Sequence, residues 1–555
     1  MVLWGTEGQV KHYFADELNK EVEMTGAQFI VKFLEHKRVT HVYGIPEAAM
    51  LSFYEAVLER EQMHSINVRQ EQTAIFMADG YARSTGKAGI CATTSGFGVT
   101  DFLTGLDSAY RDSIPLIAFV AQASKNLKGR DGFQEGSMIE MARPVTKAAY
   151  LVTKTADLPK IMSEAWKLAT QGRKGPVLID IPPNVQKGLL MINFEDYMEE
   201  ETNEQDDLLQ VTELQLQEVL TMIEEAERPV LMAGEGVAHG SATEELIDLA
   251  QLLQIPVISS VMGKDGFPNY HRLYAGMAGT LCQTPLGCKT LLESDLIMNL
   301  GGRFATQSAE EMDAYGNDRK IIHIAGDEKE ILSHVSAEVV IAADLKKFVR
   351  MLNRFIRSRD YKPTPKALER IESLQIERAG LSRQTEFESG PLKPERAIAE
   401  LRKGLRPDAI VTLDNRLIRI WAGQLYETYE PRTFLVGGRA GNPAWGIGAA
   451  LGAQLAYPER QVVNLIGNAG LSMSLQELST AAKHNIPIVV VVLQKGLGLV
   501  NVAKGMGVEA ELVERPEQIA DALVRAFSSY RPYLIEILVD TDEQYPVPTD
   551  ETRSA

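Results

Sequence analysis

The feature that most constrains the fold is an alternation that recurs along the chain: an apolar run of strand type, a glycine-bearing turn and a helical pattern. The clearest copy consists of a strand, a turn, a helix and a second strand at residues 462–466, 467–470, 472–482 and 486–493. Elements in this order form a right-handed βαβ unit of a parallel sheet. Ligands of such sheets bind at the carboxyl ends of the strands, where Asn468 and Lys495 both fall.

The alternation predicts an α/β protein with three doubly wound parallel-sheet domains. A chain of 555 residues is too long for a single core, which agrees with several domains. Thr25 is predicted to cap the first helix, because apolar residues follow it at helical spacing. The predicted parts are an N-terminal extension at 1–22, a first α/β domain at 23–188, an acidic linker at 189–212, a middle α/β domain at 213–357, a second linker at 358–392, a third α/β domain at 393–541 and a polar tail at 542–555.

Charge and composition exclude some classes of function. The net charge of −18 argues against a general nucleic-acid or anionic-membrane binder. No apolar run reaches 18 residues and the N-terminus is polar, so neither a membrane span nor a signal peptide is expected. The chain has three cysteines, and Cys91 lies in an apolar run that predicts a buried thiol. These features favour a protein of the reducing cytoplasm.

Two patterns carry candidate chemistry by themselves. Glu71 lies between a predicted strand and an apolar helix, where burial would raise the pKa of its carboxyl group and let it exchange protons. The alternative is an ordinary carboxylate that the helix dipole favours. Gly234 and Gly236 follow a strand, which suits close approach of a phosphate to backbone N–H groups, although a lone G-x-G is a weak signal.

Longer motifs resemble the thiamine-diphosphate-dependent enzymes, specifically the acetolactate synthase group. The resemblance extends over roughly residues 22–540, and its most specific stretches are 70–72, 77–87, 94–98, 132–135 and 143–147. It implies that the first domain binds the aminopyrimidine of the cofactor and that the third binds the diphosphate through a metal, the two meeting across a dimer interface. Glu71 then matches the glutamate that activates the aminopyrimidine.

The resemblance also implies a flavin site in the middle domain. The positions that match it are Gly234, Gly236, Met262, Gly263, Gly276, Met277, Gly301, Arg303, Asp327 and Asp344. Two departures weaken the match: Ala278 stands where the group has histidine, and Ala325 stands where it has an acidic residue. FAD is therefore one expected occupant, and a vacant or ADP-type site is the alternative.

The diphosphate site departs further from the group. Its Gly-Asp-Gly is Gly467-Asn468-Ala469 here, and its Asn-Asn is Gln494-Lys495. Mg²⁺ prefers oxygen ligands, whereas a protonated lysine has donors only and would repel the cation. These substitutions predict that thiamine diphosphate and Mg²⁺ are not bound in the ordinary way, and no metal ligand is assigned.

Three other changes lie near this site. Arg416-Leu417-Ile418 replaces Gly-Gln-His after the aspartate that matches Asp414, and Pro443 stands where a large residue props the cofactor. The loop that covers the site in the group is nearly absent between Val500 and Ala503. Without that cover, water exclusion would be lost.

Three hypotheses follow. In the first, the cleft serves another reaction on a small anionic, 2-oxo-acid-like substrate, and Lys495 is an anion clamp or a nucleophile unless it is a plain surface lysine. In the second, the chain decarboxylates pyruvate or a related 2-oxo acid and transfers the two-carbon unit. In the third, it is a non-catalytic paralogue that pairs with an active subunit. A homodimer or homotetramer is expected. The candidate catalytic residues are Glu71, Phe133, Gln134, Lys147 and Lys495, beside Asn468 as a cofactor contact.

Overall fold

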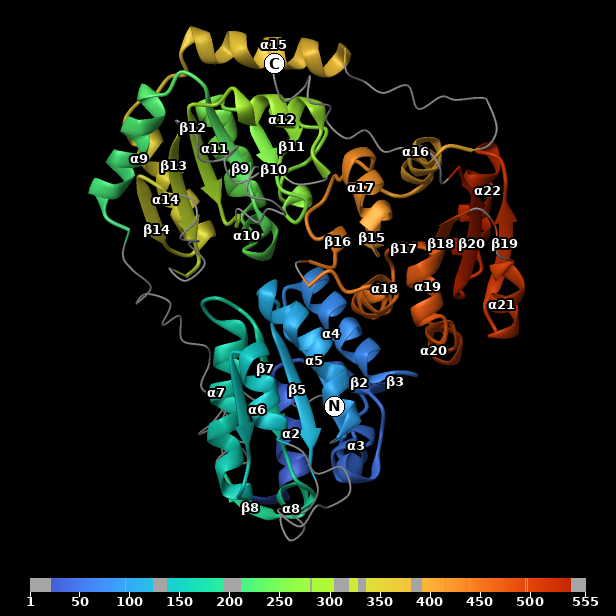
Figure 1. Ribbon diagram of the computed structural model, residues 1–555. Helices are drawn as coiled ribbons and strands as arrows, with labels where there is room; N and C mark the ends of the chain where they lie inside the picture. Colours follow the sequence, from blue (N-terminus) through green and yellow to red (C-terminus); the bar gives the residue numbers. More distant parts are fainter. Residues whose placement is uncertain are drawn as a thin grey trace, which may run out of the picture. The chain divides into compact units, whose positions relative to one another are not determined.

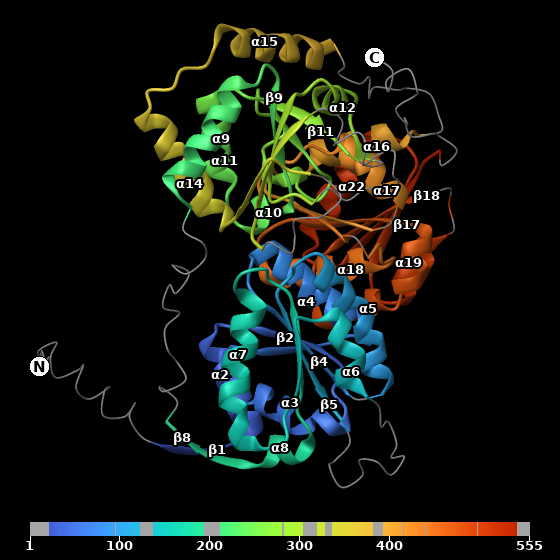
Figure 2. The same cartoon turned by 60° about the vertical axis from the view of Figure 1, so that its left-hand side comes forward.

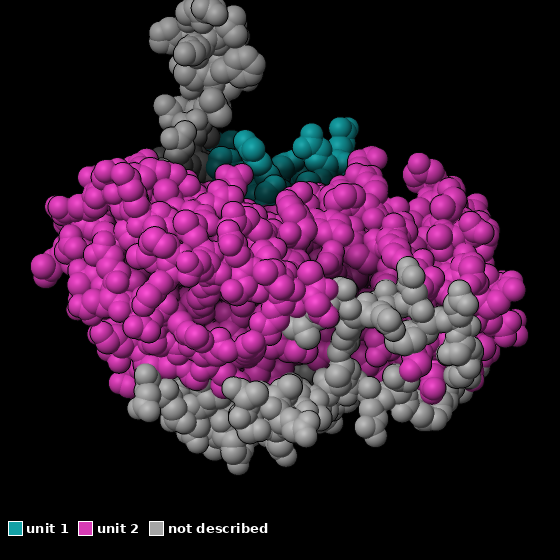
Figure 3. Space-filling model, turned by 90° about the horizontal axis from the view of Figure 1, so that it is seen from above, with its two compact units in different colours: residues 1–82, 87–205 teal, residues 83–86, 206–555 magenta. Residues whose placement is uncertain are grey.

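The computed structural model divides the chain into two compact units, which Figure 3 shows in separate colours: unit 1 holds residues 1–82 and 87–205, and unit 2 holds residues 83–86 and 206–555. Each unit is described by itself. The described residues are 21–94, 96–122, 137–193, 211–279, 282–303, 319–327, 336–380, 392–414, 416–438, 440–494, 496 and 498–540.

Unit 1 is built on a six-stranded parallel sheet with the order β3-β2-β4-β5-β7-β6, of which Figure 1 labels β2, β3, β5 and β7. Its strands are β2 (His41–Gly44), β3 (His64–Asn67), β4 (Gly89–Thr94), β5 (Leu116–Ala121), β6 (Ala148–Leu151) and β7 (Pro176–Asp180). Its helices are α2 (Gly26–His36), α3 (Leu51–Leu58), α4 (Glu71–Thr85), α5 (Phe97–Arg111), α6 (Met138–Ala142), α7 (Leu158–Thr170) and α8 (Pro183–Lys187).

The first helix and the central strands form as their sequences predict. Thr25 caps α2 with a complete capping box, in which its side chain accepts from the Gln28 N–H and the Gln28 side chain accepts from the Thr25 N–H. Every residue of β4, β5 and β7 is buried, as expected for parallel strands covered on both faces. Cys91 on β4 is fully buried, which confirms the prediction of a buried thiol, and burial raises the pKa of that thiol.

Unit 2 holds two further six-stranded parallel sheets. The middle sheet has the order β11-β10-β9-β12-β13-β14, which is the 3-2-1-4-5-6 order of dinucleotide-binding folds. Its strands are β9 (Pro229–Ala233), β10 (Val257–Ser259), β11 (Tyr274–Met277), β12 (Leu296–Leu300), β13 (Lys320–Ala325) and β14 (Val339–Ala342). Its helices are α9 (Glu213–Glu225), α10 (Glu235–His239), α11 (Thr243–Leu253), α12 (Pro285–Leu292) and α14 (Leu345–Ser358).

The third sheet has the order β16-β15-β17-β18-β20-β19, the same topology as the sheet of unit 1. Its strands are β15 (Ile410–Leu413), β16 (Phe434–Val436), β17 (Val462–Gly467), β18 (Val489–Gln494), β19 (Glu509–Val513) and β20 (Tyr533–Leu538). Its helices are α16 (Pro394–Gly404), α17 (Arg416–Leu425), α18 (Trp445–Ala456), α19 (Asn468–Ser474), α20 (Glu477–His484), α21 (Leu499–Gly505) and α22 (Glu517–Ser528). Three doubly wound parallel-sheet domains are thereby confirmed.

Both predicted linkers contain regular structure. The start of the first linker is strand β8 (Leu189–Ile192), which pairs antiparallel with β1 (Val22–Thr25). The second linker contains helix α15 (Pro365–Gly380), which lies along α12 in Figure 1 and Figure 2 and is joined to it by an ion pair of 2.9 Å between Lys289 and Glu377. The tail from residue 541 onward lies outside the described residues.

The middle and third sheets of unit 2 are joined through Asp265, a buried residue in the loop after β10. One of its carboxylate oxygens accepts hydrogen bonds from the Thr433 and Phe434 N–H groups, at 3.0 and 3.1 Å. Beside this contact, Asn269 and Thr428 exchange backbone and side-chain hydrogen bonds of 2.9 and 3.0 Å. These contacts fix the start of β16 against the middle domain.

We therefore expect Asp265→Ala to destabilise the folded state by about 2–4 kcal/mol, because two buried N–H groups lose their acceptor. Asp265→Asn is the matched control and should cost less than about 1 kcal/mol, since one amide oxygen can accept both bonds. Urea unfolding followed by circular dichroism measures both. Equal stabilities for Asp265→Ala and the parent chain would contradict this role of Asp265.

Asp265 also makes the stability of the folded state depend on pH. Burial raises the pKa of Asp265 to about 6, above its ordinary value of 3.8, although hydrogen bonds from Phe434 and Thr433 oppose the shift. Between these two pH values the folded state keeps a proton that the unfolded chain has lost, so the contribution of Asp265 to stability falls as pH rises through that window. Asp265→Asn should remove this part of the pH profile.

Candidate functional site

Glu71 is the first residue of α4, shortly after β3 in the sheet of unit 1, and it is only 6% exposed. Burial raises the pKa of its carboxyl group, and the carboxylates of Asp101 and Glu47 raise it further against a lowering by a backbone hydrogen bond. A raised pKa brings a carboxyl group closer to neutrality, where it can both give and take a proton. Its burial agrees with a proton-exchanging group, and its place at the start of α4 agrees with a helix-start carboxylate, so the catalytic role stays a prediction.

Three other predicted catalytic residues cannot be placed. Phe133 and Gln134 lie in the segment 123–136, which is outside the described residues. Lys495 is also outside them, although its neighbours Gln494 and Gly496 are described. Their roles stay predictions.

Lys147 has an evident structural function. Its ammonium donates hydrogen bonds to the carbonyl groups of Leu168 and Arg173, and to that of Gln171 at 3.3 Å. These carbonyls lie in and just beyond the last turn of α7, where a cation is favoured by the helix dipole and by carbonyls that have no helical partner. These hydrogen bonds account for the position of Lys147 without a catalytic role, and that role stays a prediction.

The glycines of the middle domain pack backbone against backbone at the carboxyl ends of β9 and β12. A Cβ on Gly234 would collide with Gly302, and one on Gly236 would lie 2.7 Å from the Gly301 Cα. The N–H groups of Gly234, Gly236 and Gly301 donate to the carbonyls of Leu300, Gly301 and Ile324, at 3.0, 2.9 and 2.9 Å. These N–H groups are occupied by protein, so the glycines serve close packing where the sequence suggested phosphate binding.

The other positions matched to a flavin site are dispersed among several structural contacts. Arg303 forms a buried ion pair with Glu235 at 3.6 Å. Asp344 caps α14 by accepting from the Lys347 N–H at 2.8 Å. Gly263 packs against Ala233, and Met262 packs on the core of the third domain. The Met277 N–H donates a hydrogen bond to Thr284, and the preceding Gly276 has a φ of 113°. Asp327 is half-buried just after β13.

Sequence reasoning missed a polar pair inside this sheet. Asn299 on β12 and His323 on β13 are register partners, and both are buried. The Asn299 amide donates to the Gly302 carbonyl at 2.7 Å, and His323 Nε2 lies 3.1 Å from the same oxygen. In the sequence, the sign of this pair is one polar residue inside each of two otherwise apolar runs. The pair holds the turn after β12 in place.

At the carboxyl edge of the third sheet, Asn468 is exposed and begins α19. The Ser472 hydroxyl lies 3.3 Å from its amide oxygen. The neighbouring strand β15 is followed by the buried Asp414, which accepts from the Ala444 N–H at 3.1 Å. Gly470 has to be glycine, because a Cβ there would collide with the Asp414 carboxylate. Asp414 therefore holds the start of α18, and α19 packs on it at Gly470.

Gln494 ends the adjacent strand β18 and is 4% exposed. Its amide nitrogen donates to the buried Glu536 carboxylate, whose other oxygen accepts from the Val500 N–H at 3.2 Å. The Gln494 amide oxygen is buried without a hydrogen-bond partner among the described residues. Amide oxygens are ligands for hard cations such as Mg²⁺. Asn468 and Gln494 thus each bring an amide oxygen to the ends of the paired strands β17 and β18, and no cluster of three His, Cys, Asp or Glu occurs among the described residues.

The chain matches three family models along its length. They are the N-terminal TPP binding domain, the central domain and the C-terminal TPP binding domain of thiamine pyrophosphate enzymes, at residues 24–141, 216–352 and 417–498. No helix among the described residues has the length and apolar character needed to span a bilayer.

Individual relatives agree with these matches. The chain is 34% identical to a Methanocaldococcus jannaschii protein named "Probable acetolactate synthase large subunit", over 94% of this chain and 93% of that one. It is 33% identical to the acetolactate synthase large subunit of Haemophilus influenzae, over 86% and 83%. A solved thiamine diphosphate-dependent 4-hydroxybenzoylformate decarboxylase from Rhodococcus jostii RHA1 shares the fold, with a TM-score of 0.81 at 22% identity over 94% of this chain and all (100%) of that one.

These matches correct the cofactor prediction. The substitutions at Asn468 and Lys495 predict that thiamine diphosphate is not an ordinary ligand. That prediction is wrong, because models of both TPP-binding domains match, the C-terminal one across the substituted turn. The physical reason is that an asparagine in place of aspartate keeps one oxygen that can bind a cation, although it loses the negative charge and the second oxygen. FAD in the middle domain stays a prediction. The findings favour the second hypothesis, the ordinary activity, over a different reaction.

The geometry of Lys147 gives a prediction that separates structure from catalysis. Lys147→Met should lower the free energy of unfolding by about 1–3 kcal/mol, because charged hydrogen bonds to carbonyls at the end of α7 are lost. Under conditions where both proteins are folded, kcat and KM should change less than about threefold. Thermal unfolding and steady-state kinetics test this, with the exposed Lys154→Met as the control. A large fall in kcat with unchanged stability would restore the catalytic assignment.

Proposed function

The chain belongs to the thiamine pyrophosphate enzymes, and on that premise we propose that it is a TPP-dependent decarboxylase and carboligase of the acetolactate synthase type, acting on pyruvate or a related 2-oxo acid. Support for the reaction comes from relatives at 33–34% identity that carry the acetolactate synthase name. The observation that carries the proposal is the buried Glu71 carboxyl with its raised pKa.

Glu71 would act as the proton-exchanging residue toward the aminopyrimidine. Its low exposure keeps water from competing for the proton, and its raised pKa gives a population of both protonation states nearer to neutral pH. The carboxylates of Asp101 and Glu47 favour the protonated state without touching the reacting atoms.

The third domain would hold the diphosphate end of the cofactor. The amide oxygens of Asn468 and Gln494 would contact the accompanying cation, and Glu536 would hold Gln494 in place through its amide nitrogen. Bound TPP supplies the electron sink that decarboxylation of a 2-oxo acid requires. With neutral ligands in place of a carboxylate, the cation would be held less tightly than by an aspartate.

We further propose a two-fold symmetric homodimer or a dimer of dimers in the cytoplasm. Symmetric assembly is the usual state of soluble homo-oligomers, and the resemblance to acetolactate synthases implies shared sites. The free Cys91, Cys282 and Cys288 suit a reducing compartment.

Titration calorimetry with TPP tests the cofactor, and carbon dioxide release from pyruvate tests the reaction. We expect saturable TPP binding in Mg²⁺, a weaker affinity after EDTA treatment, and acetolactate as the product. Absence of TPP binding at millimolar concentration, with or without Mg²⁺, would refute the proposal. Binding without any turnover of 2-oxo acids would refute the reaction alone.

The role of Glu71 gives a second measurement. Glu71→Gln should lower kcat by about 10²- to 10⁴-fold, the usual worth of a positioned acid–base group, and TPP affinity should stay within about threefold. Glu59→Gln, an exposed glutamate after α3, is the matched control and should leave kcat unchanged. Equal kcat values for Glu71→Gln and the parent would show that Glu71 moves no proton in the reaction.

A further inference from the structure

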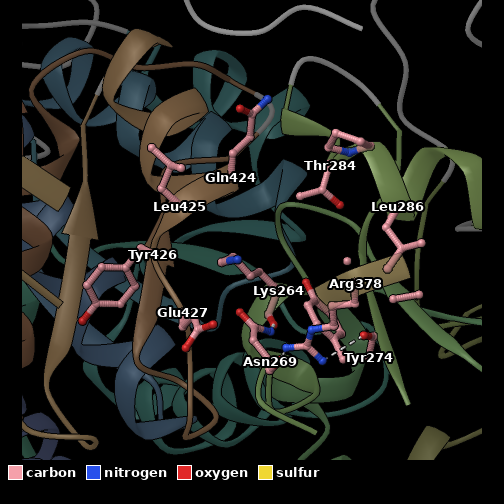
Figure 4. Close-up of a pocket in the computed structure, with 13 residues that line it drawn as sticks. Lys264, Asn269, Tyr274, Thr284, Leu286, Arg378, Gln424, Leu425, Tyr426 and Glu427 are labelled. Carbon is pink, nitrogen blue, oxygen red and sulfur yellow. Dashed lines mark hydrogen bonds between the residues drawn. The ribbon is translucent and has the colours of Figure 1, made fainter. Parts of the chain in front are cut away.

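Unit 2 contains a cavity of about 390 Å³ whose lining includes Gly276 of the positions matched to a flavin site, and none of the residues proposed for thiamine diphosphate. It lies between the loop after β10, strand β11, the start of α12, the end of α15 and the segment after α17, and Figure 4 shows its lining. Cavities of this size accept small organic ligands. The chemistry of the lining therefore decides which ligand the cavity could bind.

Lys264 is the polar group that distinguishes this cavity. Its side chain lines the cavity although the residue is only 4% exposed, and in Figure 4 its nitrogen points toward Leu425 and Tyr426. Among the described residues, the Lys264 ammonium has neither a hydrogen bond nor a salt bridge; it makes a cation–π contact, 5.7 Å from the centre of the Phe434 ring, and it feels the charge of Glu427. A buried ammonium without an ionic or hydrogen-bonding partner is costly, so the site favours an anion that supplies one.

Several other polar groups of the lining already have partners. The Arg378 guanidinium donates to the carbonyls of His271, Tyr274 and Asn269, at 3.0, 3.3 and 2.6 Å. The Tyr274 hydroxyl lies 2.9 Å from Ser259 Oγ, and the Asn269 amide donates to the Lys264 and Phe267 carbonyls. These groups shape the cavity, and of the two described cations in its lining the Lys264 ammonium is the one without a hydrogen bond to protein.

The charge balance and the apolar lining define the ligand. Lys264 and Arg378 carry two positive charges, and the exposed Glu427 carries one negative charge, so the net charge of the lining is +1. Apolar contact comes from Pro285, Leu286, Leu425 and the rings of Tyr274 and Tyr426. A ligand with a single negative charge would neutralise the lining, and an apolar body would pack against these apolar side chains.

We propose that this cavity is a binding site for a small monocarboxylate with an apolar body, held by its carboxylate on the Lys264 ammonium. None of the residues proposed for the reaction lines this cavity, and the proposal does not depend on that reaction. Because the cavity is lined by both the middle and the third domain, an occupant stabilises their junction beside the contacts of Asp265 and Asn269.

Titration calorimetry and thermal unfolding with 4-methylpentanoate test the site. We expect saturable binding with a dissociation constant below about 1 mM and a rise in unfolding temperature that increases with the probe concentration. The neutral isostere 4-methylpentanamide should bind at least about tenfold more weakly, because it cannot neutralise Lys264. Equal affinities for the acid and the amide would overturn the proposal. So would the absence of saturation at about 10 mM acid, since a small ligand with a specific site should saturate it by then.

Variants locate the binding. Lys264→Met keeps the length of the side chain and removes its charge, so it should weaken the acid at least about tenfold. Leu425→Trp should also abolish binding by filling the cavity without altering Lys264. The exposed Lys403→Met on α16 is the matched control and should bind as the parent does. Unchanged binding to a folded Lys264→Met or Leu425→Trp protein would place the ligand elsewhere and refute the site.

A pH series gives an independent readout. Burial lowers the pKa of Lys264 to about 8, against the opposing charges of Glu427, Cys282 and Asp265. Arg378 on α15 and Glu427 also line the cavity. The acid should therefore bind about tenfold or more weakly at pH 9.5 than at pH 7, as Lys264 loses its proton. A flat profile over this range would contradict the assigned contact.

Discussion

Parallel strands buried on both faces depend on complete pairing of their backbone N–H and C=O groups, and this requirement governs the rest of the molecule. Helices cover both faces of each sheet, so ionisable side chains are largely displaced to strand ends and the loops beyond them. The ionisable Glu71 and Asp414 both follow strands in this manner, and so does the polar but uncharged Asn468. The chemistry of the chain is therefore concentrated where the sheet hydrogen bonding stops.

Polar residues do occur inside strands, and the structure shows what they accomplish there. Thr412 on β15 donates to the Gly446 carbonyl at 2.8 Å and accepts from Asn464 on β17 at 3.1 Å. Glu536 on β20 holds Gln494 and the start of α21. Each of these side chains contacts a strand end or a helix start, as Asn299 does with the turn after β12. Interior polar groups thus hold the edges in shape, and mutual hydrogen bonding offsets the cost of burying them.

Much of this fold was predictable from local patterns, and the failures have physical causes. Apolar runs located the strands, and the capping pattern at Thr25 located the first helix. Helix α15 was read as a linker because only Ile371 of its residues is buried, so its apolar periodicity is weak. The helix expected over 472–482 is two helices, α19 and α20, separated at Leu475 and Gln476. Packing against other elements decides such breaks, and a single sequence does not record it.

The site was harder to predict because the same residue types serve packing and binding. Gly234 and Gly236 fit a phosphate loop in sequence, yet their N–H groups donate to β12 and the turn after it. Likewise, Asn468 in place of aspartate suggested a lost cofactor, although it keeps an oxygen donor and the family models match through it. Substitution alone says which charge has changed. It does not say whether the remaining atoms still satisfy the ligand.

Two adjacent residues show how strongly local partners decide the outcome of burial. Lys264 and Asp265 are both buried in the loop after β10, and desolvation disfavours the charged form of each. Asp265 is compensated within the chain, since two N–H groups of the third domain donate to it. Lys264 faces a cavity, where among the described residues no carboxylate lies within salt-bridge distance of it. Since full desolvation of a charge is tolerated only with a partner, the different surroundings of these neighbours imply different uses: Asp265 holds the domains together, and Lys264 is left to pair with a molecule from outside the chain.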